Sequence, residues 1–95
     1  MFDSIACRVF HLDRGRGAET VAISIGRPCL ISESDDEWVC EIRIEDSLGT
    51  AVRPTYGIDS LQALRLAMRL LEVTVEALQV QYGHSITFLD DRDLL

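Results

Sequence analysis

The stretch GIDSLQALRLAMRLLEVTVEALQVQY, residues 57–82, decides the fold of this chain. Its apolar residues recur at steps of three and four, which predicts one long α-helix. Asp59 is a suitable N-cap, with Gln62 three residues later as in a capping box. Gly83 is a suitable C-terminal stop. At 1.5 Å per residue, such a helix is about 35 Å long.

Apolar residues lie on two sides of this predicted helix when they are placed at about 100° intervals around its axis. The first stripe is longer and bulkier, and we expect it to pack on a sheet: Leu61, Leu64, Met68, Leu71, Val75, Leu78 and Tyr82. The second stripe lies nearly opposite: Leu66, Leu70, Val73, Ala77 and Val80. A polar strip between them is expected to face water: Gln62, Arg65, Arg69, Glu72, Glu76 and Gln79.

The second stripe needs a cover, because large exposed apolar patches are unusual. Burying one Val or Leu side chain is worth roughly 1.5–3 kcal/mol. The sequence predicts no second long helix to meet this stripe. It therefore predicts a homodimer, in which the stripe forms the interface with an antiparallel copy of itself across a two-fold axis. The alternative is that the C-terminal residues, the first strand or a curled sheet covers the stripe within one chain.

Alternating apolar residues predict strands at 4–12, 19–26, 38–45, 51–56 and 84–90. The cleanest alternation places Trp38, Cys40, Ile42 and Ile44 on one face, opposite a wet face with Val39, Glu41, Arg43 and Glu45. In the second strand Val21, Ile23 and Ile25 share a face. The first strand has apolar residues of both parities, which indicates two partly covered faces or a bulge.

Glycine and proline delimit these strands. The segment DRGRGA, residues 13–18, reads as a hairpin turn rather than a phosphate-binding loop, because no helix follows it. Pro28 ends the second strand, and Pro54 restricts the fourth to an edge or a short piece. The predicted fold class is α+β: an antiparallel sheet of four to five strands with one long α-helix packed on one face. Residues 1–95 are expected to form a single domain.

The charge balance limits the classes of partner. The net charge is −7, and residues 33–46 contain seven acids against the single base Arg43. This balance opposes binding to nucleic acid, whose affinity comes mainly from neutralised phosphates. The predicted acidic loop 33–46 suits a basic protein partner, or it only keeps the chain soluble. The sequence has no secretory signal and no apolar run of membrane-spanning length, so we expect a cytoplasmic protein without membrane contact.

Candidate catalytic and metal-binding residues are few, and we predict no enzyme, no cofactor and no metal site. Cys7, Cys29 and Cys40 are widely and irregularly spaced, which does not fit a zinc site. They suit free thiols in a reducing cytoplasm. Cys7 and His11 would lie about 13 Å apart on one strand, too far for a nucleophile and its base.

Four polar residues flank the predicted sheet and the start of the helix. They form a candidate ligand-binding or structural cluster: Arg8, Arg27, Tyr56 and Asp59. An arginine–carboxylate contact there would tie the sheet to the N-terminus of the helix. We expect a structural role before a ligand site.

Three segments resemble a family of small bacterial proteins known only as a domain of unknown function. They are Gly26-Arg27-Pro28, Trp38-Val39-Cys40 with the following Ile42–Glu45, and Tyr56–Leu64, which contains Gly-x-Asp-Ser-Leu-Gln-Ala-Leu. The resemblance covers residues 5–89. It implies the α+β order and a bacterial cytoplasmic setting, and it implies no activity, catalytic residue or ligand. The absence of Lys and Asn, which have AT-rich codons, also indicates a GC-rich and bacterial genome.

The sequence therefore favours a non-enzymatic homodimeric interaction or assembly module. One alternative is an immunity-type or antitoxin-like inhibitor that binds a basic partner through residues 33–46. Another is a small-ligand-binding domain, whose pocket would be lined by Arg8, Arg27 and Asp59.

Overall fold

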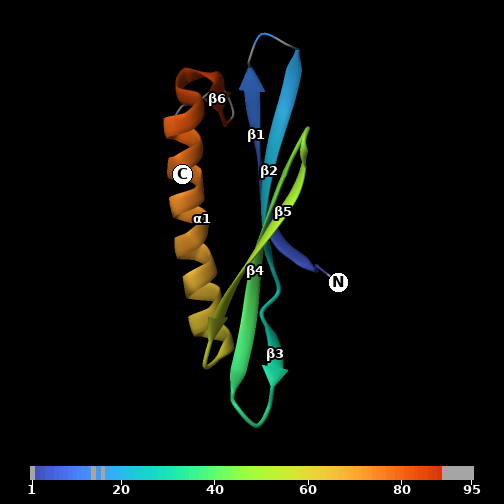
Figure 1. The fold of residues 1–95 in the computed structure, drawn as a ribbon, viewed down its shortest axis with the longest axis vertical. Coiled ribbons are helices and arrows are strands. Elements are labelled where there is room, and N and C mark those ends of the chain that lie inside the picture. The colour runs from blue at the N-terminus through green and yellow to red at the C-terminus, as the bar shows by residue number, and fades with distance from the viewer. Residues whose placement is uncertain (1, 14, 16, 89–95) are drawn as a thin grey trace.

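The computed structural model describes residues 2–13, 15 and 17–88, with an antiparallel sheet and one long helix along one face (Figure 1). The predicted α+β fold class is confirmed. In chain order the elements are β1 (Ser4–Asp13), β2 (Ala18–Gly26), β3 (Cys29–Ser32), β4 (Glu37–Asp46), β5 (Gly49–Gly57), α1 (Ser60–Tyr82), the 3₁₀ turn η1 (Gly83–Ser85) and β6 (Ile86–Thr87).

Strand β4 organises the sheet, because other strands pair with both of its edges. β5 pairs along one edge over its whole length, so β2 and β3 share the other edge. β1 pairs with β2, and β6 pairs with β1 at His11 and Leu12. Pro28 separates β2 from β3, and the Pro54 strand lies at an edge, both as predicted. β5 runs for nine residues and is therefore not a short piece.

The core fills the space between α1 and one face of the sheet. One buried cluster contains Phe10, Leu12, Val21, Ile23, Val75 and Ile86. The other contains Ile25, Cys40, Ile42, Ala63 and Ala67, with Trp38 and Ile44 packed against it. The predicted inward faces of the second strand and of residues 38–45 are thus confirmed. The first strand has an irregular register between Ser4 and Ala6, and it buries Phe10 and Leu12 while Ile5 and Val9 are exposed.

The opposite face of β4 is drier than predicted. Val39, Glu41 and Arg43 are half-buried there. The guanidinium carbon of Arg43 lies 4.2 Å from the centre of the Phe2 ring. This contact explains part of the burial, because an aromatic ring and a guanidinium stack favourably and exclude water.

Helix α1 contacts the sheet through a face that includes part of the first predicted stripe and extends to Ala63 and Ala67, which lie between the two stripes. Ala63, Ala67 and Val75 are each 0% exposed, whereas Leu61 and Met68 of the first stripe are 65% and 46% exposed. The assignment of the whole first stripe to the sheet is therefore wrong for these two residues. The reason is close approach, since alanines let the helix backbone approach the sheet more closely than leucines do.

The close approach is visible at the start of the helix. The Thr55 hydroxyl lies 2.8 Å from the Cys40 carbonyl oxygen and 3.0 Å from the Ala63 carbonyl oxygen, so it links β5 to both β4 and α1. A Cβ atom added at Gly57 would lie 2.6 Å from the Ala63 nitrogen. Glycine is therefore required at position 57 by space rather than by backbone conformation.

Both predicted ends of α1 are confirmed. The Gln62 amide donates to Asp59 Oδ1 at 2.7 Å, and the Gln62 side-chain oxygen accepts from the Ile58 amide at 2.8 Å. This is the predicted capping box, except that the Gln62 side chain accepts from the amide of Ile58 and not from that of Asp59. Gly83 has a φ of 56° and donates its N–H to the Gln79 carbonyl at the C-terminal end.

Three other predictions need correction or limitation. Residues 33–46 are not a loop, because β4 occupies residues 37–46 and only the turn before it is irregular. Strand β3 was missed, as its four residues are too few to show a period. The last strand, predicted at 84–90, is limited to Ile86–Thr87, and residues 89–90 lie outside the described residues. In the described part of the chain, no helix is long and apolar enough to cross a bilayer.

Candidate functional site

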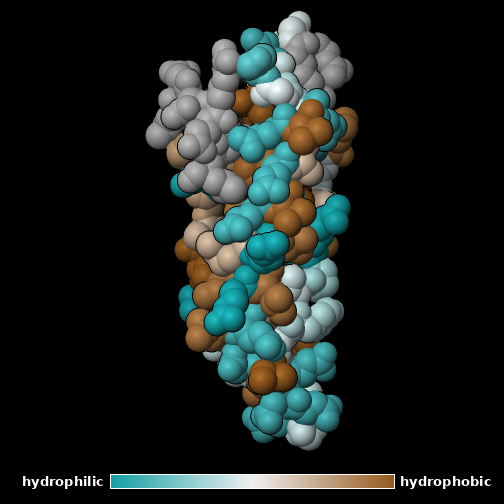
Figure 2. Space-filling view, turned by 90° about the vertical axis from the view of Figure 1, so that its left-hand side faces the viewer, coloured by the Kyte–Doolittle hydropathy of each residue, from teal (hydrophilic) through white to brown (hydrophobic). Residues whose placement is uncertain are grey.

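One flank of α1 presents apolar side chains away from the core. Leu66, Val73 and Val80 are 42%, 50% and 88% exposed, and Ala77 is also exposed. These four residues are called the outer stripe below. Figure 2, which looks at the helix side of the molecule, shows a hydrophilic band with hydrophobic surface on both sides. Arg65, Arg69, Glu72 and Glu76 of the predicted polar strip are all exposed.

Leu70, the fifth residue of the predicted interface, occupies a different environment. It is half-buried and packs against the cluster formed by Ile25, Cys40, Ile42, Ala63 and Ala67. A single chain therefore covers part of Leu70 without any partner. The surface that remains available for a partner is the outer stripe.

The four residues of the predicted polar cluster have different neighbours. Arg27 Nε lies 2.8 Å from Asp3 Oδ2, and this hydrogen bond raises the pKa of Arg27. The guanidinium carbon of Arg8 lies 4.3 Å from the centre of the Phe88 ring. Asp59 caps α1 at the opposite end from Phe88. The predicted tie between an arginine and the helix N-terminus is thus replaced by the Arg27–Asp3 pair, which joins the residue before β1 to the residue after β2.

Tyr56 belongs to a hollow at the tip of the β3–β4 hairpin. The hollow has a volume of about 450 Å³ and is lined by Asp35, Asp36, Glu37, Tyr56, Gly57, Ile58 and Gln62. The three acids Asp35, Asp36 and Glu37 are called the acidic tip below. They place negative charge beside an exposed tyrosine ring. Arg8 and Arg27 line other hollows, so these arginines do not share one pocket with Asp59.

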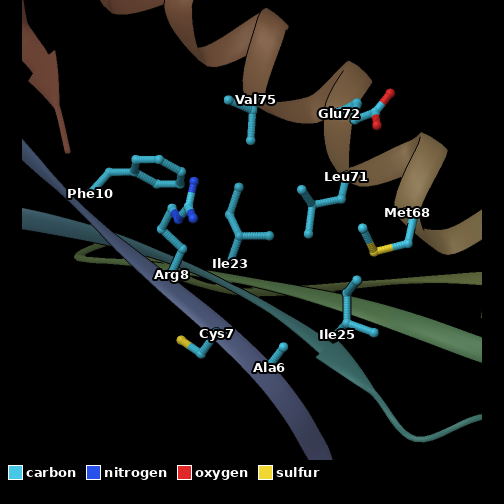
Figure 3. A pocket seen from close by; sticks show the side chains of 10 residues that line it. All are labelled: Ala6, Cys7, Arg8, Phe10, Ile23, Ile25, Met68, Leu71, Glu72 and Val75. Carbon is cyan, nitrogen blue, oxygen red and sulfur yellow. The ribbon is translucent and has the colours of Figure 1, made fainter. Parts of the chain in front are cut away.

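A groove between β1 and α1 was not anticipated from the sequence. It has a volume of about 370 Å³, and its lining is mostly apolar. Figure 3 shows Ile23 and Ile25 on its sheet side and Met68 and Leu71 on its helix side, with Arg8 reaching in from β1. No sequence signal marks this groove, because the helix pattern assigned Met68 to the core, whereas the structure exposes it.

Comparison of the chain with family models shows a match that extends over residues 6–94. The chain belongs to the DUF6968 family, a domain of unknown function. The predicted membership of an uncharacterised family is confirmed at this level. Searches of curated proteins and of solved structures find no match.

The cysteines of this DUF6968 chain differ in environment. Cys7 and Cys29 are exposed and Cys40 is buried, and all three are free thiols. Burial raises the pKa of the Cys40 thiol, and the neighbouring Cys29 and Glu41 raise it further. The Cys40 thiol lies 3.3 Å from the Gly26 carbonyl oxygen, to which it donates. Among the described residues, no group of three or more His, Cys, Asp or Glu side chains could hold a metal ion.

Proposed function

We propose that the DUF6968 chain is a non-enzymatic interaction module that assembles as a homodimer through the outer stripe of α1. The observation that supports this most is the exposure of Leu66, Val73 and Val80 along one helix flank. These side chains are larger than the alanines that the same helix buries. A second apolar surface would remove them from water, at roughly 1.5–3 kcal/mol for each Val or Leu fully buried.

The spacing of the outer stripe suits an antiparallel pair of helices. Val73 lies midway between Leu66 and Val80 in the sequence. A two-fold axis at Val73 would place Leu66 against Val80 of the partner subunit, and the reverse, as an isologous interface requires. Arg69 and Glu76 lie on the adjoining polar strip at nearly the same distance on either side of Val73. Each would then approach an opposite charge on the other copy.

The test is the solution mass of the wild type and of a double variant, Leu66→Glu with Val73→Glu. Light scattering should give twice the mass of one chain for the wild type and a single-chain mass for the variant. Leu48→Glu is the matched control, because Leu48 is 88% exposed and lies in the turn between β4 and β5. It should remain dimeric.

A further variant tests the position of the axis. Val73→Cys, in a chain that also carries Cys7→Ser and Cys29→Ser, should form a disulfide-linked dimer on mild oxidation. A wild-type mass of one chain at about 100 μM, well above the dissociation constants of specific complexes, would refute the proposal. So would a dimer that the double glutamate variant leaves intact. The free thiols suit a reducing compartment, and we place the protein in the bacterial cytoplasm.

A second candidate function is inhibition of a basic partner, of the immunity or antitoxin type. It is favoured by the acidic tip, whose three carboxylates border an open hollow beside Tyr56. An oligolysine peptide serves as the probe. Asp35→Asn with Asp36→Asn should weaken its binding, whereas Glu72→Gln with Glu76→Gln removes the same charge elsewhere and should not. If both double variants weaken peptide binding equally, the effect comes from net charge alone, and the acidic tip is rejected as the binding site.

A further inference from the structure

Strand β6 brings the end of the described chain onto β1 beside the apolar groove. β6 pairs with β1 antiparallel, at His11 and Leu12. The next residue, Phe88, packs its ring edge-on against that of Phe10, with 6.2 Å between the ring centres. Phe10 is itself part of the groove lining. The described chain therefore ends at one end of the groove, beside the strand that forms one of its walls.

The register of β6 on β1 indicates which residues would come next to the groove. Residues 89–92 follow in the sequence and lie outside the described residues. In an antiparallel pair, each step forward in one strand is a step back in the other. Continued without a bulge, the observed register places Asp90 opposite Arg8 and Arg92 opposite Ala6. Opposite residues share a sheet face, and Arg8 and Ala6 both line the groove (Figure 3).

The charges at these register positions complement those of the groove. The guanidinium carbon of Arg8 lies 4.3 Å from the centre of the Phe88 ring, so this cation stands beside the point where Asp90 would follow. Glu72 is exposed on the helix side of the groove, where Arg92 would face it. Opposite charges on facing residues stabilise strand pairs, and both charged residues would meet an opposite charge.

The alternate residue suits the other sheet face. The same register places Leu89 opposite Val9, which is 44% exposed on the face away from α1. An apolar side chain would thus meet an apolar neighbour outside, while the acid and the base turn toward the groove. Asp91 would fall opposite Cys7, also on the outer face.

We propose that residues 89–92, called the strap below, continue β6 along β1 and close the groove, with Asp90 paired to Arg8 and Arg92 paired to Glu72. Partly exposed ion pairs contribute little each, so the strap opens while the sheet and the helix stay folded. A ligand of the groove must first displace it. The strap is separate from the outer stripe, so this device does not rest on dimerisation.

Charge reversal in the full chain tests the pairing of Asp90 with Arg8. Amide hydrogen exchange followed by NMR reports on the β1 amides between Ala6 and Phe10 that do not bond to β2. Arg8→Glu and Asp90→Arg should each speed this exchange at least tenfold. The combined variant should slow it again at least threefold, because opposite charges face one another once more. Asp91→Arg makes the same change of charge on the other sheet face and should leave the exchange unchanged.

A disulfide test measures the register directly. In a chain that also carries Cys7→Ser and Cys29→Ser, one pair of variants is Ala6→Cys with Arg92→Cys. It should form an intramolecular disulfide on mild oxidation at least tenfold faster than Ala6→Cys with Asp91→Cys, whose thiols would lie on opposite faces. Circular dichroism shows which variants are folded, and the disulfide pairs keep the proposal testable if a charge variant is not.

Several outcomes would overturn the proposal. Equal rates for the two disulfide pairs would reject the register. Disulfides formed only between chains would assign the groove to a second copy. Exchange at β1 that Asp90→Arg leaves unchanged, or that the combined variant does not slow again, would reject the pairing of Asp90 with Arg8.

Discussion

Side-chain size alone does not separate the inner face of α1 from its outer stripe. The inner face buries Ala63 and Ala67 completely, whereas the outer stripe exposes Leu66, Val73 and Val80. In a lone helix packed on a sheet, the larger apolar residues are expected inside. The difference shows that close approach to β4 and β5 decides the inner face, because Thr55 and Gly57 contact the helix backbone directly. The larger residues outside are then available to a partner.

The largest expected effect on the free energy of unfolding appears when two valines of α1 are compared. Val75 is 0% exposed and Val80 is 88% exposed. Val75→Ala should lower the free energy of unfolding by about 2–3 kcal/mol, since it removes buried methyl groups and leaves a cavity. Val80→Ala should change it by less than about 0.5 kcal/mol at protein concentrations low enough to keep the chain monomeric. Urea unfolding measures both. Equal losses would abolish the distinction between the inner face and the outer stripe.

An intermediate effect is expected where α1 approaches β5 most closely. Gly57→Ala should destabilise the fold by roughly 1–3 kcal/mol, because the new methyl group meets the Ala63 backbone and the helix must shift. Thermal unfolding provides the measurement, with Ser60→Ala at the exposed first residue of α1 as the control. A Gly57→Ala chain as stable as the wild type would mean that the helix does not sit so close to the sheet.

The smallest expected effect on stability concerns Cys40, on the sheet face that meets the helix. Cys40 lies on the inner face with a raised pKa, so the folded chain holds this proton more tightly than the unfolded chain does. The resulting stability is fully present below the unfolded pKa and is lost as the pH rises through the folded one. Stability of the wild type should therefore fall above pH of about 9 more steeply than that of Cys40→Ala.

Thiol reactivity gives an independent measurement of the same difference. At neutral pH, a disulfide reagent should label the exposed Cys7 and Cys29 and leave the buried Cys40 unreacted in the native chain. Labelling of three thiols at one rate, without denaturant, would show that the inner face is open to solvent.

The strands and the helix ends were predictable from the sequence because their signals are local. Alternation in Val21, Ile23 and Ile25 and in Trp38 to Ile44 reports which face is buried, since successive side chains of a strand point to opposite sides. Asp59 and Gly83 mark the helix ends because capping depends on residues within one turn. Strand β3 was too short to show a period, and its pairing with β4 depends on the hairpin that β4 completes.

The candidate site was only partly predictable. The sequence identified the outer stripe, but it could not separate Leu70 from its four neighbours. It also could not reveal that Arg27 pairs with Asp3 across the chain or that Met68 borders a groove. These features depend on the rotation of α1 about its axis and on its distance from the sheet. Neither quantity is encoded in a helical period alone.

By itself, the sequence determined that this chain forms an antiparallel sheet followed by one capped helix with apolar residues on more than one side. These properties follow from hydrophobic periodicity, proline and glycine, and residues that cap a helix. The tertiary structure alone decided which side of the helix meets the sheet and how closely the two approach. Both depend on contacts between residues distant in the chain, where a glycine and two alanines permit an approach that larger side chains would prevent.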